Sequence, residues 1–205
     1  MLLLGYVMFL SVTRTPDPAK KPALLEQIVD HFLDKSLSTL TFRSLAAALD
    51  VSTFTLVYHF GSRNQLVRDI METIANRERG FETTVEIEAI DLDSYIAALA
   101  HTFQITLLPR NRALQRLEFE AQILESLTEQ GTTRAAQERL QELAVRTLIA
   151  LGLSPVDALL ESRLLIDTFY GIQFGLVVTG DEAQARASFE RAARNHRQRI
   201  SELTA

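Results

Sequence analysis

Apolar side chains recur at helical spacing along most of the chain, and no stretch alternates apolar and polar residues for long enough to predict a strand. The eight glycines and five prolines fall mostly between these helical patterns. The predicted helices are residues 23–35, 41–49, 52–59, 63–79, 91–108, 109–129, 133–151 and 155–179, with a last one that follows Gly180-Asp181 and ends at Leu203. The sequence therefore predicts an all-α fold of about nine helices.

Two short helices, residues 41–49 and 52–59, lie close together in the sequence. Thr41 and Ser52 are suitable N-caps for them. Leu45 and Leu56 supply contact residues, and Val51 inserts between the helices. Two short helices with so tight a connection predict a helix-turn-helix, whose second helix enters the major groove of DNA. From spacing alone, a plain helical hairpin with the same core is the alternative.

The same stretch resembles the signature of the tetracycline-repressor (TetR) family of transcriptional regulators. The matching residues are a Thr-opened helix, Leu45-Ala46, Val51-Ser52, Thr55-Leu56, Tyr58-His59-Phe60, Gly61-Ser62-Arg63 and Leu66. The resemblance implies an N-terminal three-helix DNA-binding domain with a helix-turn-helix in residues 20–66. It also implies a C-terminal helical ligand-binding and dimerisation domain in residues 67–205.

The predicted DNA-binding residues occupy nine positions of this segment. The resemblance implies that Thr53, Phe54, Thr55 and Tyr58 face bases or the groove wall, and that Arg43, Tyr58, His59 and Arg63 contact phosphates, with Thr41 and Ser52 as caps in the same segment. The sequence departs from the family pattern at Asp50, Phe54 and Val57. Asp50 tolerates the left-handed turn where glycine is usual. Phe54 either packs on a thymine methyl group or against the first helix.

The last two predicted helices are expected to form a dimer interface. The last one carries an apolar stripe of Ala185, Phe189, Ala192, His196, Ile200 and Leu203, and the one before it is apolar on more than one side. The resemblance implies that these helices pair between subunits in a four-helix bundle. The interface residues are predicted to be Phe169, Phe189, Ala192, His196 and Ile200. A monomeric bundle with both faces internal is the alternative.

A helical body of this size often encloses a pocket. The candidate lining residues combine aromatic rings with neutral amides: His101, Phe103, Gln104, Phe119, Gln122, Phe169, Tyr170, Gln173 and Phe174. This mixture favours a small, largely apolar effector that is neutral or weakly charged. The alternative is that these aromatic residues are ordinary core residues.

Composition excludes several other classes of protein. The net charge is −5, with seven Lys/Arg against six Asp/Glu in residues 1–70 and a net of −6 over the remainder, a division typical of a DNA-binding module on an acidic body. Cysteine is absent, and no glycine-rich phosphate loop, H-E-x-x-H or G-x-S-x-G motif occurs. We therefore expect no enzyme, no metal and no cofactor.

The first 19 residues form an apolar N-terminal extension. The apolar run at residues 1–12 is shorter than the roughly 20 residues of a membrane span and lacks the basic residues of a secretory signal. An extended or disordered segment, a start at Met8 and an exported or anchored protein all remain open.

The sequence thus predicts a cytoplasmic, homodimeric regulator that binds double-stranded DNA at a near-palindromic operator, with a small apolar effector and no membrane partner. A DNA-bound protein whose body contacts another protein is the alternative.

Overall fold

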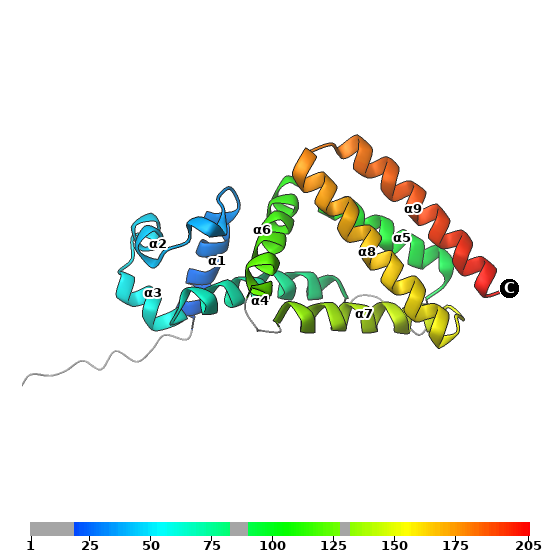
Figure 1. Ribbon diagram of the computed structural model, residues 1–205, viewed down its shortest axis with the longest axis horizontal. Coiled ribbons are helices and arrows are strands. Elements are labelled where there is room, and N and C mark those ends of the chain that lie inside the picture. Colours follow the sequence, from blue (N-terminus) through cyan, green and yellow to red (C-terminus); the bar gives the residue numbers. More distant parts are fainter. Residues whose placement is uncertain (1–18, 83–89, 128–131) are drawn as a thin grey trace, which may run out of the picture.

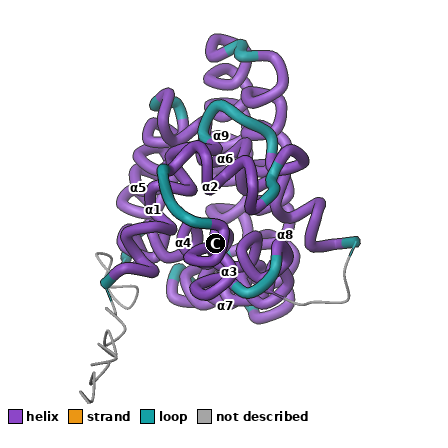
Figure 2. The backbone as a smooth tube through the Cα atoms, turned by 90° about the vertical axis from the view of Figure 1, so that its left-hand side faces the viewer, coloured by secondary structure: helices purple, strands orange, loops and turns teal. Residues whose placement is uncertain are grey.

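The computed structural model describes residues 19–82, 90–127 and 132–205, and helices joined by loops make up these ranges (Figures 1 and 2). The helices are α1 (Lys20–Phe32), the 3-10 helix η1 (Leu37–Thr39), α2 (Phe42–Leu49), α3 (Thr53–Phe60), α4 (Arg63–Glu82), α5 (Leu92–Thr106), α6 (Pro109–Ser126), α7 (Thr132–Ala150), α8 (Pro155–Thr179) and α9 (Glu182–Leu203). The all-α prediction is confirmed, and the described ranges hold the nine predicted α-helices. The apolar extension of residues 1–19 lies outside them except for Ala19.

Local side-chain chemistry sets most helix ends where the sequence predicted them. The side chains of Thr41, Ser52, Asp91 and Ser154 each accept a hydrogen bond from a backbone N–H three residues on. Asp50 takes the left-handed conformation, with φ 52° and ψ 45°, that the turn between α2 and α3 requires.

Two features of the first helices differ from the prediction. α1 begins at Lys20 and ends at Phe32, three residues earlier at each end than expected. Pro22 is accommodated because the backbone N–H groups of a helix's first turn have no partner within the helix. The short η1 follows, and Ser36 caps it by accepting from the N–H of Ser38 at 3.1 Å.

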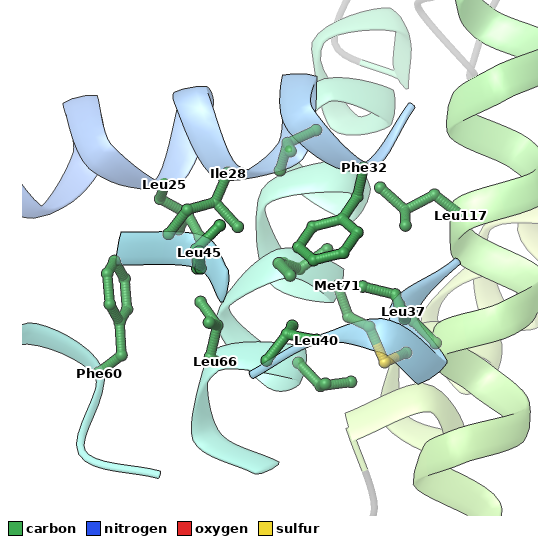
Figure 3. Close-up of a cluster of buried hydrophobic side chains, with 14 of the residues drawn as sticks. Leu25, Ile28, Phe32, Leu37, Leu40, Leu45, Phe60, Leu66, Met71 and Leu117 are labelled. Carbon is green, nitrogen blue, oxygen red and sulfur yellow. The ribbon is translucent and has the colours of Figure 1, made fainter. Parts of the chain in front are cut away.

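The head, which we define as α1–α3, gathers at one end of the molecule and shares one hydrophobic core with α4 and α6 (Figure 1). Figure 3 shows side chains of α1, η1, α2, α3 and α4 converging, with Leu117 of α6 closing the cluster. Leu45, Leu56 and Leu66 are fully buried there. Packing of these leucines fixes α3 against α2 and α4.

The body, α5–α9, has two further cores. One joins Tyr95, Leu148, Leu165 and Ile200, and the other joins Phe103, Leu176 and Phe189. α8 packs against α7 on one side and α9 on another (Figure 1). α4 runs from the head into the body, and the predicted division at residue 66 falls inside α4, so its position remains a prediction.

Candidate functional site

α3 presents one face to its own core and the opposite face to solvent. Leu56 and Phe60 are buried, whereas Phe54 is 77% exposed and Tyr58 is 60% exposed. The two exposed rings stack on each other with centroids 6.4 Å apart. The exposure of Phe54 rules out its packing against the first helix, because such packing would bury the ring.

The remaining candidates for DNA contact divide into two groups. Thr41, Arg43, Ser52 and Thr53 are exposed along α2 and the start of α3, and Thr55 and His59 are half-buried. In the caps, the Thr41 hydroxyl lies 2.8 Å from that of Ser44, and Ser52 lies 2.8 Å from Thr55. These hydroxyl groups form hydrogen bonds within the chain, and the Thr41 and Ser52 side chains are also exposed to solvent.

Arg63 has a role that its sequence position did not indicate. Its guanidinium donates to the backbone carbonyl of Leu40 at 3.2 Å and to that of Leu37 at 3.0 Å. These bonds satisfy carbonyl groups around η1 and join it to the first turn of α4. Arg63 is therefore a structural tie in the head, and its predicted phosphate contact would need these bonds to break or to be shared.

A cavity of about 400 Å³ lies between α4 and helices of the body. Its lining comes from five helices, α4 to α8: Ile74, Tyr95, Leu99, Thr102, Ile105, Thr106, Asn111, Leu114, Gln115, Glu118, Leu140, Leu143, Ala144, Thr147, Leu165, Ile166, Phe169, Tyr170 and Gln173. The volume suits a drug-sized organic molecule. Ile74 belongs to α4, the helix that packs in the core of the head, so the cavity also contacts that helix.

Three of the nine predicted lining residues, Phe169, Tyr170 and Gln173, do line this cavity. They occupy successive positions on the inward face of α8. The lining residues of α4, α5, α6 and α7 were missed, although three threonines, Thr102, Thr106 and Thr147, were a sequence signal for α5 and α7.

The other six predicted lining residues lie elsewhere, which corrects the prediction. Phe103 is buried in the core, stacked on Phe189 with centroids 4.2 Å apart. His101 is exposed, and the exposed Gln104 accepts a bond from Arg186 at 2.8 Å. These three residues miss the cavity because α5 turns them toward α9 or toward solvent.

The remaining three lie beside the cavity on α6 and α8. Phe119 packs against Tyr170 and Phe174, with ring centroids 6.0 and 5.8 Å away, and Phe174 is 52% exposed. Gln122 donates to the Glu118 carboxylate at 2.8 Å. Glu118 lines the cavity, whereas Gln122 is not part of the lining.

The apolar stripe of α9 faces the chain's own core, which corrects the predicted interface. Phe189, His196 and Ile200 are buried against α5 and α8 of the same chain, and Phe169 joins the same cores. Ala192 is half-buried. Because α5 and α8 of the same chain already cover these buried residues, they are not available to a second subunit. A charge at Phe189 is therefore expected to unfold the body, not to separate two subunits.

A row of exposed apolar side chains lies instead on α8. Leu160, Leu164, Asp167, Gly171, Phe174 and Val178 share one solvent-facing side of this helix, at alternating steps of four and three residues. We call this set the α8 face. Steps of this kind give the seam along which helices pair. A Cβ added at Gly171 would meet no atom within 4 Å, so a second helix can approach closely there.

Buried polar groups join α5, α8 and α9 next to the cavity. The Tyr95 hydroxyl lies 3.1 Å from His196 Nε2, and His196 Nδ1 lies 4.0 Å from a carboxylate oxygen of Glu161. Burial lowers the pKa of His196 below its ordinary value, and the attraction of Glu161 opposes this shift. Glu161 also pairs with Arg199 at 3.2 Å. Burial raises the pKa of the Tyr95 hydroxyl well above its ordinary value.

α6 is bound to the head by a polar linkage. Arg116 donates to the carbonyl groups of Phe32, at 2.5 Å, and Lys35, at 2.9 Å, and pairs with Glu120 at 3.0 Å. Glu120 in turn accepts a hydrogen bond from the Ser36 hydroxyl. The opposite side of the same helix lines the cavity with Gln115 and Glu118. α6 therefore contacts both the cavity and the head.

Among the residues with described positions, no three His, Cys, Asp or Glu side chains converge to hold a metal ion. No helix in those ranges has the length and apolar character needed to cross a membrane.

Comparison with known proteins identifies the fold. No protein-family model matches the sequence, and no curated protein matches it. Solved structures do match: the multidrug binding protein EbrR complexed with imidazole has a TM-score of 0.65 at 19% identity, over 89% of this chain and 94% of that one. A TetR family transcriptional regulator from Pseudomonas syringae pv. tomato str. DC3000 has a TM-score of 0.65 at 17% identity, over 88% and 96%.

A third match is a variant of TetR from Acinetobacter baumannii AYE in complex with minocycline, with a TM-score of 0.61 at 20% identity, over 93% of this chain and 99% of that one. At such identities the likeness is one of fold. The chain has the fold of the TetR-family transcriptional regulators over most of its length.

Proposed function

We propose that the chain is a ligand-responsive, DNA-binding transcriptional regulator, a dimeric repressor that acts in the cytoplasm. The observation that carries the proposal is the α2–α3 pair. Two capped helices meet at a left-handed Asp50, and α3 rests on buried Leu56 and Phe60 while it exposes Phe54 and Tyr58. An exposed, rigidly supported second helix of this kind is what enters a major groove.

The exposed groups on the head suit a DNA surface. Phe54 and Tyr58 offer apolar edges to thymine methyl groups, and the Tyr58 hydroxyl can bond to a base or a phosphate. Arg43 is exposed on α2 and free to reach the phosphate backbone. Arg43 therefore replaces Arg63 as the head's first candidate for a phosphate contact, since Arg63 is held by two carbonyl groups.

A dimer through the α8 face would give the protein two heads. Leu160, Leu164, Phe174 and Val178 are each more than half exposed in the single chain, and a partner subunit would cover them together with Asp167 and Gly171 between them. Two-fold symmetry would set two α3 helices toward successive major grooves about 34 Å apart, so the operator would be a near-palindrome.

The cavity would make DNA binding responsive to a small molecule. α6 lines the cavity on one side and is bonded to the loop after α1 on the other. A ligand that fits one arrangement of α6 better than another would shift the spacing of the two heads, because only differential affinity can shift a conformational equilibrium. Two proteins of the same fold are described with small molecules, imidazole and minocycline, which supports a ligand-binding body.

A second candidate is a DNA-bound protein whose body contacts another protein. The exposed α8 face is the observation in its favour, because a partner other than a second copy could cover it. The cavity of about 400 Å³ favours the ligand-responsive regulator. Light scattering separates the two: a homodimer supports the regulator, and a monomer that dimerises at no accessible concentration supports the interaction protein.

Selection of bound DNA from a random pool tests the proposal. We expect a near-palindromic site, and we expect Tyr58→Ala to weaken binding to it while the protein stays folded, because Tyr58 is 60% exposed. Arg43→Ala should lower the slope of log K against log salt by about 0.9 per subunit, the value of one released counterion. Arg194→Ala, a distant and 66% exposed arginine of α9, is the matched control.

Two results would overturn the assignment. One is a random-pool selection that recovers no preferred sequence. The other is wild-type affinity and salt dependence in both head variants at physiological ionic strength, which would show that α3 and Arg43 do not face DNA.

A further inference from the structure

The solvent-facing side of α3 consists of aromatic, β-branched and hydroxyl side chains. Phe54 is 77% exposed, Tyr58 is 60% exposed and Val57 is 45% exposed, and Thr53 is exposed at the start of the helix. The helix Thr53–Phe60, which the structure describes over its whole length, contains no lysine, arginine, aspartate, glutamate, asparagine or glutamine. The exposed side of α3 can therefore offer a base only apolar contact and hydroxyl groups.

The base edges in the major groove of DNA differ in what they require of a protein. Arginine and lysine bind guanine O6 and N7, asparagine and glutamine bind adenine N6 and N7, and carboxylates accept from cytosine N4. The C5-methyl group of thymine is recognised instead by apolar contact, for example with a phenylalanine ring or a threonine methyl group. α3 has side chains of the second kind and lacks those that make paired hydrogen bonds to purines.

The two exposed rings of α3 lie together on a firmly supported helix. Phe54 and Tyr58 are one turn apart, and their rings stack with centroids 6.4 Å apart. Beneath them, the Ser52 side chain accepts from the N–H of Thr55 at 3.0 Å, and Leu56 is fully buried. Grouped apolar side chains of this size at a surface mark a binding site. The two rings therefore form one apolar surface that is present before DNA binds.

The polar groups in and near α3 discriminate poorly between bases. The hydroxyl groups of Thr53 and Tyr58 can both donate and accept, so they can bond to any base and select weakly among them. His59 is half-buried near the C-terminal end of α3, whereas the N-terminal residues of the second helix contact base edges. Arg43 lies on α2, the helix that crosses the phosphate backbone, and phosphate contacts carry no sequence information.

We propose that α3 selects its DNA sites through C5-methyl groups, so that each half-site presents thymines or 5-methylcytosines to Phe54, Val57 and Tyr58. The inference rests on the proposed function, because it names the base chemistry that the DNA-binding helix recognises. 5-Methylcytosine carries its methyl group at the same ring position as thymine, so the same apolar contact accepts it. Removing these methyl groups should weaken binding, although base pairing and phosphates stay the same.

Substitution of deoxyuridine for thymidine tests the proposal, because uracil pairs as thymine does and lacks only the methyl group. The site recovered from a random pool is the probe, and fluorescence anisotropy measures its affinity for the full-length protein. We expect each contacted thymine to lose about fourfold in affinity when it is replaced, the value of one buried methyl group. The slope of log K against log salt should stay unchanged, because no phosphate contact is altered. Replacement throughout both half-sites that changes affinity by less than about twofold would overturn the proposal.

Methylation of cytosine provides the converse measurement. Replacing a contacted T·A pair by C·G should weaken binding, and a methyl group added at C5 of that cytosine should recover about fourfold in affinity. Equal binding of the methylated and unmethylated probes would contradict recognition of the methyl group.

Variants assign the effect to α3. Phe54→Ala removes a ring that is 77% exposed, so the protein should stay folded while the ratio of thymine to uracil affinity falls severalfold. Tyr58→Phe removes only the hydroxyl group, so total affinity should fall and the ratio should stay. Leu127→Ala is the matched control, because Leu127 is 79% exposed and follows α6, outside the head. A ratio that Phe54→Ala leaves unchanged would overturn the assignment to this helix.

The selection itself separates failure of this inference from failure of the proposed function. A preferred near-palindrome that binds equally well with uracil would support the DNA-binding regulator and overturn methyl recognition. A preferred site whose affinity depends on guanines and on Arg43 would also support the regulator, and it would replace methyl recognition with base recognition from α2. Recovery of no preferred sequence would overturn both.

Discussion

Leu164 of the α8 face gives the sharpest test of assembly. In the single chain its side chain is 62% exposed, so Leu164→Glu places a carboxylate where water already reaches. The stability of the isolated subunit should change by no more than about 0.5 kcal/mol, as is usual for surface substitutions. Any larger effect on the assembled protein must then come from what covers the α8 face.

The magnitude follows from the exposed fraction. Complete burial of a leucine side chain is worth about 1.5–3 kcal/mol, so covering the exposed 62% contributes about 1–2 kcal/mol per copy. Two-fold symmetry makes the loss about 2–4 kcal/mol per dimer, and two carboxylates buried without partners add several kcal/mol more. The dissociation constant of the dimer should therefore rise by about a thousandfold or more.

Light scattering coupled to size-exclusion chromatography, over a range of protein concentrations, measures the change. Leu127→Glu is the control, since Leu127, the C-cap residue after α6, is 79% exposed and is not part of the α8 face. It should leave the dimer intact. Phe189→Glu should instead abolish folding, because that ring is 5% exposed and stacked on Phe103. An intact Leu164→Glu dimer at low micromolar concentration would refute the assignment of this face to the interface.

Two further predictions concern the buried polar groups. The lowered pKa of His196 means that the unfolded chain binds its proton more readily, so the free energy of unfolding should fall as pH drops below about 6.5. His196→Gln should flatten this dependence in urea titrations between about pH 7 and pH 5.5, and an unchanged slope would contradict it. Burial alone would raise the pKa of Glu120, but hydrogen bonds from Ser36 and two backbone N–H groups, with Arg116 nearby, outweigh it and lower the pKa. Glu120→Gln should lower the free energy of unfolding in urea titrations by about 1 kcal/mol, and an unchanged value would contradict the role of this carboxylate in joining α6 to the head.

Much of the fold could be predicted from local signals. Periodicity, caps such as Ser52 and Ser154, and breaks such as Gly180 depend on residues within a few positions of one another, so the sequence alone determined the number and approximate bounds of the helices. The helix-turn-helix could be predicted for the same reason. Its caps, its turn at Asp50 and its buried Leu45 and Leu56 all lie within one short segment.

Tertiary structure decided which apolar stripe faces which neighbour. The stripe of α9 and the several apolar sides of α8 were both candidates for an interface in the sequence, and a dimer interface was predicted on Phe189 and Ile200. Both residues are core, and the exposed apolar surface is the α8 face. Periodicity reveals that a face is buried, but not whether the same chain or a second one buries it.

The cavity and the role of Arg63 were likewise decided by distant contacts. The lining takes residues from five helices. Phe103 is aromatic, as was expected of a lining residue, but α5 orients its ring toward Phe189. Arg63 bonds to carbonyl groups more than twenty residues away. Such contacts depend on how helices cross and on which way each is rotated, and these are properties of side-chain packing between segments that no local pattern contains.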